Sequence, residues 1–175
     1  NYMIGTYSGV ADTSWYDSSK TTFMITTPEE LFGFASLVND GKITDQTVYL
    51  GADIIVNGGW TASATAPTYP WSKIGSGSLD FAGTFDGQGH SISGIYINEE
   101  KSAGYVGLFA YASGEIKNFS LENSYIASDG NMIGSIVGFL TGNMSGVSSS
   151  AIVVNTADGN VTASPDDTDY LEREC

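Results

Sequence analysis

Cysteine is nearly absent from this sequence, and its absence limits how the chain can be held together. The one cysteine among 175 residues is Cys175, the last of them. A lone cysteine excludes a disulfide within the chain and a zinc site built on cysteine. We therefore expect a fold stabilised by packing alone, and we assign no metal and no cofactor.

Positive charge is also scarce. Six Lys and Arg residues stand against twenty Asp and Glu residues, which gives a formal net charge of −14 at pH 7. So acidic a chain repels polyanions, and this excludes nucleic acid and anionic membrane surfaces as partners. The longest apolar stretch, residues 132–140, is less than half of the roughly 20 residues that cross a bilayer, which excludes membrane insertion. Because the sequence starts at Asn1 and not at methionine, we expect a mature or trimmed product.

Proline is rare, whereas glycine is abundant. The chain has four prolines and 22 glycines, with 41% hydrophobic and 15% charged residues. The hydrophobic fraction is that of a folding chain and not of a disordered one. Many glycines and few prolines are typical of short strands joined by tight turns. The composition therefore predicts one all-β domain over residues 1–175.

One helix is expected near the start of the chain. Thr27 suits the N-cap, Pro28 suits the first helical position, and Glu30 completes a capping box. Apolar residues then recur at helical spacing on one face. The pattern predicts a helix at residues 28–39, within a capping segment at 27–41.

Two short runs rich in β-branched residues follow the helix, and a long loop comes after them. Residues 47–50 and 53–56 predict strands, and residues 57–70 predict the loop. Three large aromatic residues lie in or beside this loop: Trp60, Tyr69 and Trp71. They either fold back as a small core beneath the loop or form a platform for a ligand.

The second half of the chain repeats itself. The apolar positions of residues 85–97 recur in residues 109–121, so that Ile116 follows Ile92 by 24 positions, and a looser third copy spans 137–147. Repeats of this length, with glycine at their corners, are typical of a β-solenoid whose coils stack on one another. Gly142 stands in the third copy where Gly114 stands in the second.

The repeats also predict which side chains stack inside the solenoid. Two interior columns are expected, each with one residue from every copy. The columns are Ile92, Ile116 and Met144, and Ile95, Phe119 and Val147.

Several motifs resemble the GLUG-type repeat modules of bacterial cell-surface and secreted proteins. The most specific is Phe-Ala-Gly-Thr-Phe-Asp-Gly-Gln-Gly-His at residues 81–90. Trp-Ser-Lys-Ile-Gly at 71–75 and Gly-Leu-Phe-Ala-Tyr at 107–111 accompany it, and the likeness spans roughly residues 23–155. The resemblance implies a right-handed parallel β-helix, as in adhesins and in non-catalytic regions of surface peptidases. It carries no active site.

The expected architecture is therefore all-β, a right-handed parallel β-helix of about four coils. Residues 1–26 form a lead-in, the helix caps or flanks the solenoid, residues 42–155 form the coils, and residues 156–175 form an acidic tail or C-terminal cap. The tail lacks the ordered spacing of an EF-hand calcium loop, so a solvated terminus is the preferred interpretation over a calcium site.

No group of residues suggests catalysis. The only arginine is Arg173, the lysines share no motif, and the only histidine is His90. We interpret Asp86, Gly87, Gly89 and His90 as a structural turn at a corner of the solenoid, in which Asp86 accepts hydrogen bonds from backbone amides. We assign no catalytic residue.

The sequence favours a non-enzymatic adhesion or binding module, located outside the cell or on a bacterial surface. Its expected partner is an extracellular glycan or a surface protein, with Trp60, Tyr69 and Trp71 as candidate contact residues. End-to-end stacking, or attachment to further domains, is expected if the last coil is left uncovered. A structural spacer or stalk is the alternative. A carbohydrate-active enzyme, with Asp80 or Asp86 lining a cleft, is favoured least.

Overall fold

The computed structural model describes residues 6–100, 104–130, 132–156 and 160–163. The acidic stretch at 166–174 and Cys175 lie outside the described residues, so the predictions made for them are not addressed. Strands and one helix follow one another along the described part of the chain. The elements are β1 (Thr22–Ile25), α1 (Pro28–Asn39), β2 (Thr47–Leu50), β3 (Ile54–Ile55), β4 (Thr84–Ser93), β5 (Tyr96–Glu99), β6 (Phe109–Ala112), β7 (Glu115–Glu122), β8 (Tyr125–Ser128), β9 (Val137–Leu140), β10 (Asn143–Ser149), β11 (Ile152–Asn155) and β12 (Asn160–Ala163).

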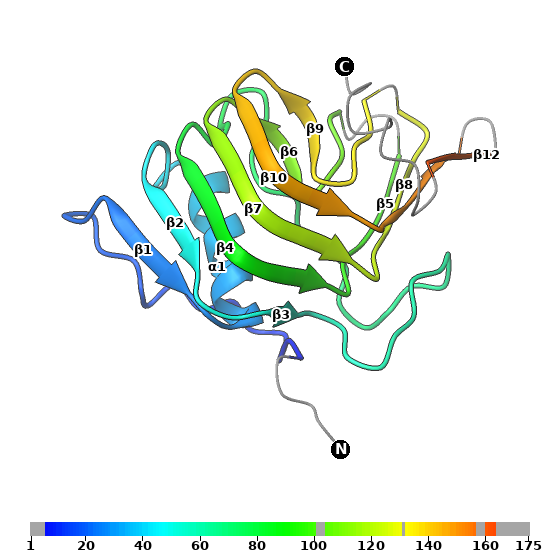
Figure 1. Ribbon diagram of the computed structural model, residues 1–175, viewed down its shortest axis with the longest axis horizontal. Helices are drawn as coiled ribbons and strands as arrows, with labels where there is room; N and C mark the ends of the chain where they lie inside the picture. The colour runs from blue at the N-terminus through cyan, green and yellow to red at the C-terminus, as the bar shows by residue number, and fades with distance from the viewer. Residues whose placement is uncertain (1–5, 101–103, 131, 157–159, 164–175) are drawn as a thin grey trace.

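The strands form three sheets that wind around one core (Figure 1). The largest has the order β1-β2-β4-β7-β10, and β3 pairs with β4 beside this path. The second contains β5, β8, β11 and β12, and the third contains β6 and β9. All pairs are parallel except β11 with β12. The chain is a right-handed parallel β-helix of about five turns, which confirms the predicted fold class with one turn more than expected.

The register between coils confirms part of the predicted columns. Phe85 pairs with Ile116, and Ile116 pairs with Met144. Phe119 pairs with Val147 in the next column. The predicted neighbours Ile116 and Met144, and Phe119 and Val147, are therefore correct.

The predicted place of Ile92 and Ile95 in these columns is wrong. Ile92 pairs with Leu121, and Ile95 lies beyond the end of β4. The physical reason is a β-bulge between Asp86 and His90, where the register of β4 against β7 shifts. A bulge adds residues to one strand only, so a gapless match of apolar positions places the residues on either side of it in the wrong rung.

This bulge is also where the predicted structural turn lies. Gln88 and Gly89 have positive φ values of 52° and 83°, and Asp86 Oδ1 accepts a hydrogen bond of 2.9 Å from the Gln88 amide. The predicted role of Asp86 is therefore confirmed. The predicted location is wrong, because the segment lies within β4 and not at a corner between strands. Gly87 has no room for a side chain, since a Cβ would lie 2.3 Å from the Cβ of Phe119.

His90 lies in this segment as part of a surface pair. Its Nδ1 is 3.1 Å from Asp53 Oδ1, and the same oxygen accepts a hydrogen bond of 3.0 Å from the Ser91 amide. That amide is the main reason why the pKa of Asp53 is lowered. A lowered pKa stabilises the fold at neutral pH, and this contribution is lost as the pH falls through the folded-state pKa. It is small, because Asp53 is exposed.

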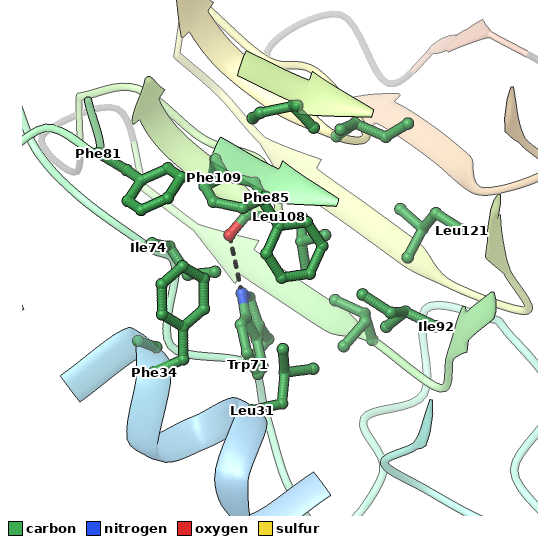
Figure 2. Close-up of a cluster of buried hydrophobic side chains, with 14 of the residues drawn as sticks. Leu31, Phe34, Trp71, Ile74, Phe81, Phe85, Ile92, Leu108, Phe109 and Leu121 are labelled. Carbon is green, nitrogen blue, oxygen red and sulfur yellow. Dashed lines mark hydrogen bonds between the residues drawn. The ribbon is translucent and has the colours of Figure 1, made fainter. Parts of the chain in front are cut away.

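Helix α1 has the predicted bounds and closes the core on the inner side of the large sheet. Thr27 Oγ1 accepts from the Glu30 amide at 3.1 Å, and the Glu30 carboxylate accepts from the Thr26 amide at 3.0 Å. Figure 2 shows Phe34 of α1 among the aromatic rings of the coils. Its ring centroid lies 5.6 Å from that of Phe85 in a stacked arrangement, and both side chains are fully buried.

A column of glycines lets the coils approach one another where the chain enters the large sheet. Gly83, Gly114 and Gly142 occupy equivalent places, and a Cβ on each would lie 1.9 Å from a carbonyl oxygen of the preceding coil. Those carbonyls belong to Gln46, Gly83 and Gly114 respectively. The predicted equivalence of Gly142 and Gly114 is therefore confirmed, and its cause is close main-chain contact.

We predict that Gly114→Ala lowers the free energy of unfolding by about 1–3 kcal/mol, because the new methyl group must push two coils apart. Gly77→Ala is the matched control, since its Cβ would meet only the Tyr105 ring at an ordinary 3.9 Å. Urea unfolding followed by circular dichroism measures both. Equal midpoints for the two variants would contradict the role of the glycine column.

Candidate functional site

Trp71, one of the three predicted contact residues, is buried in the core, and its assignment as a contact residue is wrong. It is only 4% exposed, and its Nε1 donates a hydrogen bond of 3.0 Å to the Leu108 carbonyl (Figure 2). The reason is that the segment after the loop acts as a rung of the third sheet. Ile74 forms a parallel bridge with Phe109 of β6. The Trp71 main-chain amide donates to the Tyr96 carbonyl at 2.8 Å, so contacts with other strands hold both ends of this segment.

The other two predicted contact residues are half-buried. The Trp60 ring stands edge-on to Tyr96 at a centroid distance of 6.0 Å, and its Nε1 donates to the Thr65 carbonyl. Tyr69 stands edge-on to Tyr7 at 5.1 Å. These contacts favour the interpretation of a small core beneath the loop. A contact role for Trp60 and Tyr69 stays a prediction.

Two asparagines fix the 57–70 loop in place. Asn57 is 5% exposed, and its Nδ2 donates to the carbonyls of Tyr69 and Gly94, both at 2.8 Å. Asn123 Nδ2 donates to the Trp60 carbonyl at 2.7 Å, and its Oδ1 accepts from the Ala62 amide at 2.8 Å. The loop is therefore fastened over the outer face of β5 and β8, and it shields that face.

A second group of aromatic side chains lies on the outer face of the third sheet. We call Tyr105, Tyr111 and Phe139 the Tyr105 cluster. The ring centroids of Tyr105 lie 5.6 Å from Tyr111 and 5.1 Å from Phe139, and those of Tyr111 and Phe139 lie 5.0 Å apart. All three side chains are partly exposed. Within the described part of the chain, no hydrogen bond uses the hydroxyl of Tyr105 or Tyr111.

The sequence contains a signal for this cluster that the repeat analysis did not use. Tyr111 in β6 and Phe139 in β9 are register partners, 28 positions apart. Ile116 and Met144 are separated by the same interval. Following the outward positions at this interval, and not only the inward ones, would have shown an aromatic pair on the surface.

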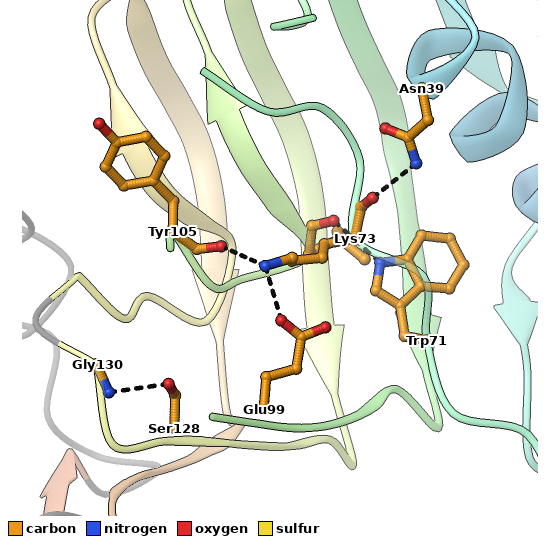
Figure 3. Close-up of polar contacts among 8 residues, drawn as sticks. Asn39, Trp71, Lys73, Glu99, Tyr105, Ser128 and Gly130 are labelled. Carbon is orange, nitrogen blue, oxygen red and sulfur yellow. Dashed lines mark hydrogen bonds and ion pairs between the residues drawn. The ribbon is translucent and has the colours of Figure 1, made fainter. Parts of the chain in front are cut away.

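Lys73 holds the main chain of the cluster in position (Figure 3). Its Nζ lies 2.7 Å from Glu99 Oε2 and donates to the Tyr105 carbonyl at 2.9 Å. The Lys73 main chain is fixed in turn by Asn39, at the end of α1, whose Nδ2 donates to the Lys73 carbonyl at 3.0 Å. The position of Tyr105 thus depends on contacts that reach back to the helix.

A small cavity opens beside the Tyr105 ring. It has a volume of about 190 Å³, and its lining includes Lys73, Gly75, Ser76, Gly77, Gly104 and Tyr105. Gly77 and Gly104 leave open space there, since a Cβ on Gly77 would meet only the Tyr105 ring at 3.9 Å and a Cβ on Gly104 would meet no atom within 4 Å. A second, shallower hollow of about 420 Å³ lies over the bulge, between Gln88 of β4, Asn118 of β7 and Gly146 of β10.

Neither cavity has the residues that hydrolysis would need. Asp80 and Asp86, the carboxylates named for an enzymatic role, line neither of them. Asp80 instead accepts a hydrogen bond from Ser113 Oγ, and Asp86 accepts from the Asn118 amide group at 3.2 Å. Among the described residues, no three His, Cys, Asp or Glu side chains are grouped as metal ligands. What the Tyr105 cavity offers is aromatic surface with polar groups at its edge.

Comparison with known proteins gives one match to a part of the chain. "Putative Gly-rich membrane protein" of Evansella cellulosilytica is 38% identical over 79 residues. These residues make up 44% of this chain and 9% of that protein. No family model matches the chain, and no solved structure matches it. In the ranges that the structure describes, no helix has the length and hydropathy needed to span a membrane.

We predict that the two tryptophans differ in their contribution to stability. Trp71→Ala lowers the free energy of unfolding by about 3–5 kcal/mol, because it leaves a cavity in the core. Trp60→Ala lowers it by about 1 kcal/mol, because it removes one edge-on ring contact at the surface. Chemical denaturation measures both values. A Trp60→Ala variant as unstable as Trp71→Ala would show that the loop is part of the main core.

Proposed function

We propose that this domain is a non-enzymatic adhesion or binding module of a bacterial cell-surface or secreted protein. It contacts its partner, a glycan or a protein, through the Tyr105 cluster. One observation carries the proposal: three adjoining aromatic rings remain partly exposed beside an open cavity.

Aromatic side chains on the outside of a solenoid need an explanation. The core is complete without the Tyr105 cluster, because the inward positions of β6 and β9 are filled by Phe109 and Val137. Tyrosine and phenylalanine are enriched at recognition surfaces, and aromatic side chains combine a large apolar area with few rotatable bonds. Two phenol hydroxyls that bond to no described residue add polar groups for a partner. The net charge of −14 favours neutral or basic partners over acidic ones.

The proposed location rests on two likenesses. The matched relative is a bacterial protein that is named as a membrane protein, and the matched residues cover 9% of its length. The motifs at residues 71–90 resemble GLUG-type modules of surface and secreted proteins. Both likenesses support a module within a longer protein that is displayed on, or released from, the cell.

A structural spacer is the second candidate. It is supported by the 57–70 loop, whose aromatic residues are buried or half-buried and fastened by Asn57 and Asn123. A spacer would bind no partner of its own, so a binding measurement separates the two functions.

The test is binding of the fluorescently labelled domain to an array of immobilised glycans and extracellular-matrix proteins, with calcium or with EDTA. We expect saturable binding by the parent and at least a tenfold loss for Tyr111→Ala, because a central aromatic contact of an interface contributes about 2 kcal/mol or more.

Trp15→Ala is the matched control, since it removes a partly exposed aromatic ring that lies outside both the cluster and the 57–70 loop. It should bind like the parent. Circular dichroism shows that both variants are folded. Absence of saturable binding by the parent would overturn the proposal and favour the spacer. Equal loss in both variants would overturn the assignment of the contact surface to the Tyr105 cluster.

A further inference from the structure

The size of the cavity beside Tyr105 limits what it can hold. Its volume is about 190 Å³. Sites for drug-sized ligands measure about 300–1,000 Å³. The cavity therefore suits one six-membered ring, and a peptide segment would not fit inside it.

The charge around the cavity is balanced. Lys73 is the one charged side chain in its lining, and the Lys73 Nζ is paired with Glu99 at 2.7 Å. The protein as a whole carries a net charge of −14. This negative charge repels a ligand that carries a carboxylate or sulfate. The cavity offers such a ligand no unpaired positive charge in return.

The remaining lining combines a ring face with small polar groups. The Tyr105 ring provides a flat apolar surface with a negative face, which attracts the C–H groups of a saturated ring. Ser76 Oγ accepts a hydrogen bond of 3.1 Å from the Leu79 amide, so its own hydrogen can still be donated. Within the described residues, the Gly77 amide donates to no acceptor. A hexose presents both of these surfaces, C–H groups on its ring face and hydroxyls around its edge.

We infer that the cavity beside Tyr105 binds a single neutral hexopyranose unit, stacked on the Tyr105 ring with its hydroxyls toward Ser76 and Gly77. This inference rests on the proposed binding function and narrows its partner to a neutral glycan. The main-chain hydrogen bond from Lys73 to Tyr105 makes Lys73 a positioning residue for the ring.

The test is an NMR titration of the 15N-labelled domain with three probes: methyl glucoside, methyl galactoside and methyl mannoside. For a ligand of this size in a surface site we expect a dissociation constant of roughly 1 mM for at least one of them. The amide signals of Gly77 and Gly104 should shift. Methyl glucuronide, which matches the glucoside in shape but carries a carboxylate, should bind at least tenfold more weakly.

Variants of Tyr105 separate stacking from other effects. Tyr105→Ala should lose at least tenfold in affinity, whereas Tyr105→Phe keeps the ring and should lose less than threefold. Trp15→Ala should leave the affinity unchanged. Shifts confined to other parts of the chain, equal binding of the glucuronide, or unchanged affinity in Tyr105→Ala would each overturn the inference.

The outcome also distinguishes this inference from the proposed function. In one outcome, the domain binds the array and loses this binding in Tyr111→Ala, while the three glycosides neither compete nor shift its NMR signals. That result supports the binding function, overturns the hexose inference and points to a protein partner. Absence of both array binding and glycoside binding overturns both.

Discussion

Every other feature of this protein depends on the parallel pairing of one coil with the next. A single coil cannot cover its own apolar face, so it is stable only when its main chain bonds to neighbouring coils. That pairing needs backbones to approach closely at the corners, and Gly83, Gly114 and Gly142 make this possible, since a Cβ at each would meet a carbonyl 1.9 Å away. Helix α1 then fills the core beside the first coils, with Phe34 stacked on Phe85.

The inward side chains form the core that stabilises the fold, so the outward side chains are free to differ. The three sheets accordingly have different outer faces. The large sheet presents mostly short polar side chains around its bulge. The 57–70 loop covers the second sheet, with Trp60 against Tyr96. Among the described residues, the third sheet leaves an aromatic group partly exposed beside a cavity, at Tyr105, Tyr111 and Phe139. The proposed site thus lies on the outer face of the third sheet, away from the second sheet that the 57–70 loop covers.

Features set by local chemistry or by the regular repeat could be predicted from the sequence, and features set by irregular contacts between coils could not. The helix at 28–39 was predictable because its cap and its period lie within one segment. Ile92 was placed in the wrong rung because the bulge at Asp86 changes the length of β4 relative to β7, which no local pattern reveals. Trp71 was assigned to the surface because it adjoins a loop, whereas its main-chain amide bonds to the Tyr96 carbonyl and its side chain is buried. The Tyr105 cluster was not predicted, because the predicted columns contain only inward positions, whereas Tyr111 and Phe139 point outward.

Strand β12 has a consequence for growth of the stack. It runs antiparallel to β11, with Val154 opposite Val161, and so occupies the edge that another parallel strand of the second sheet would use (Figure 1). In the described ranges, β9 and β10 pair only with strands of the preceding coil. At this end of the solenoid, β9 and β10 each have an edge that pairs with no described strand, whereas β12 occupies the corresponding edge of β11. A further parallel strand could pair with β11 only if β12 left that edge, a constraint that the earlier coils do not impose on one another.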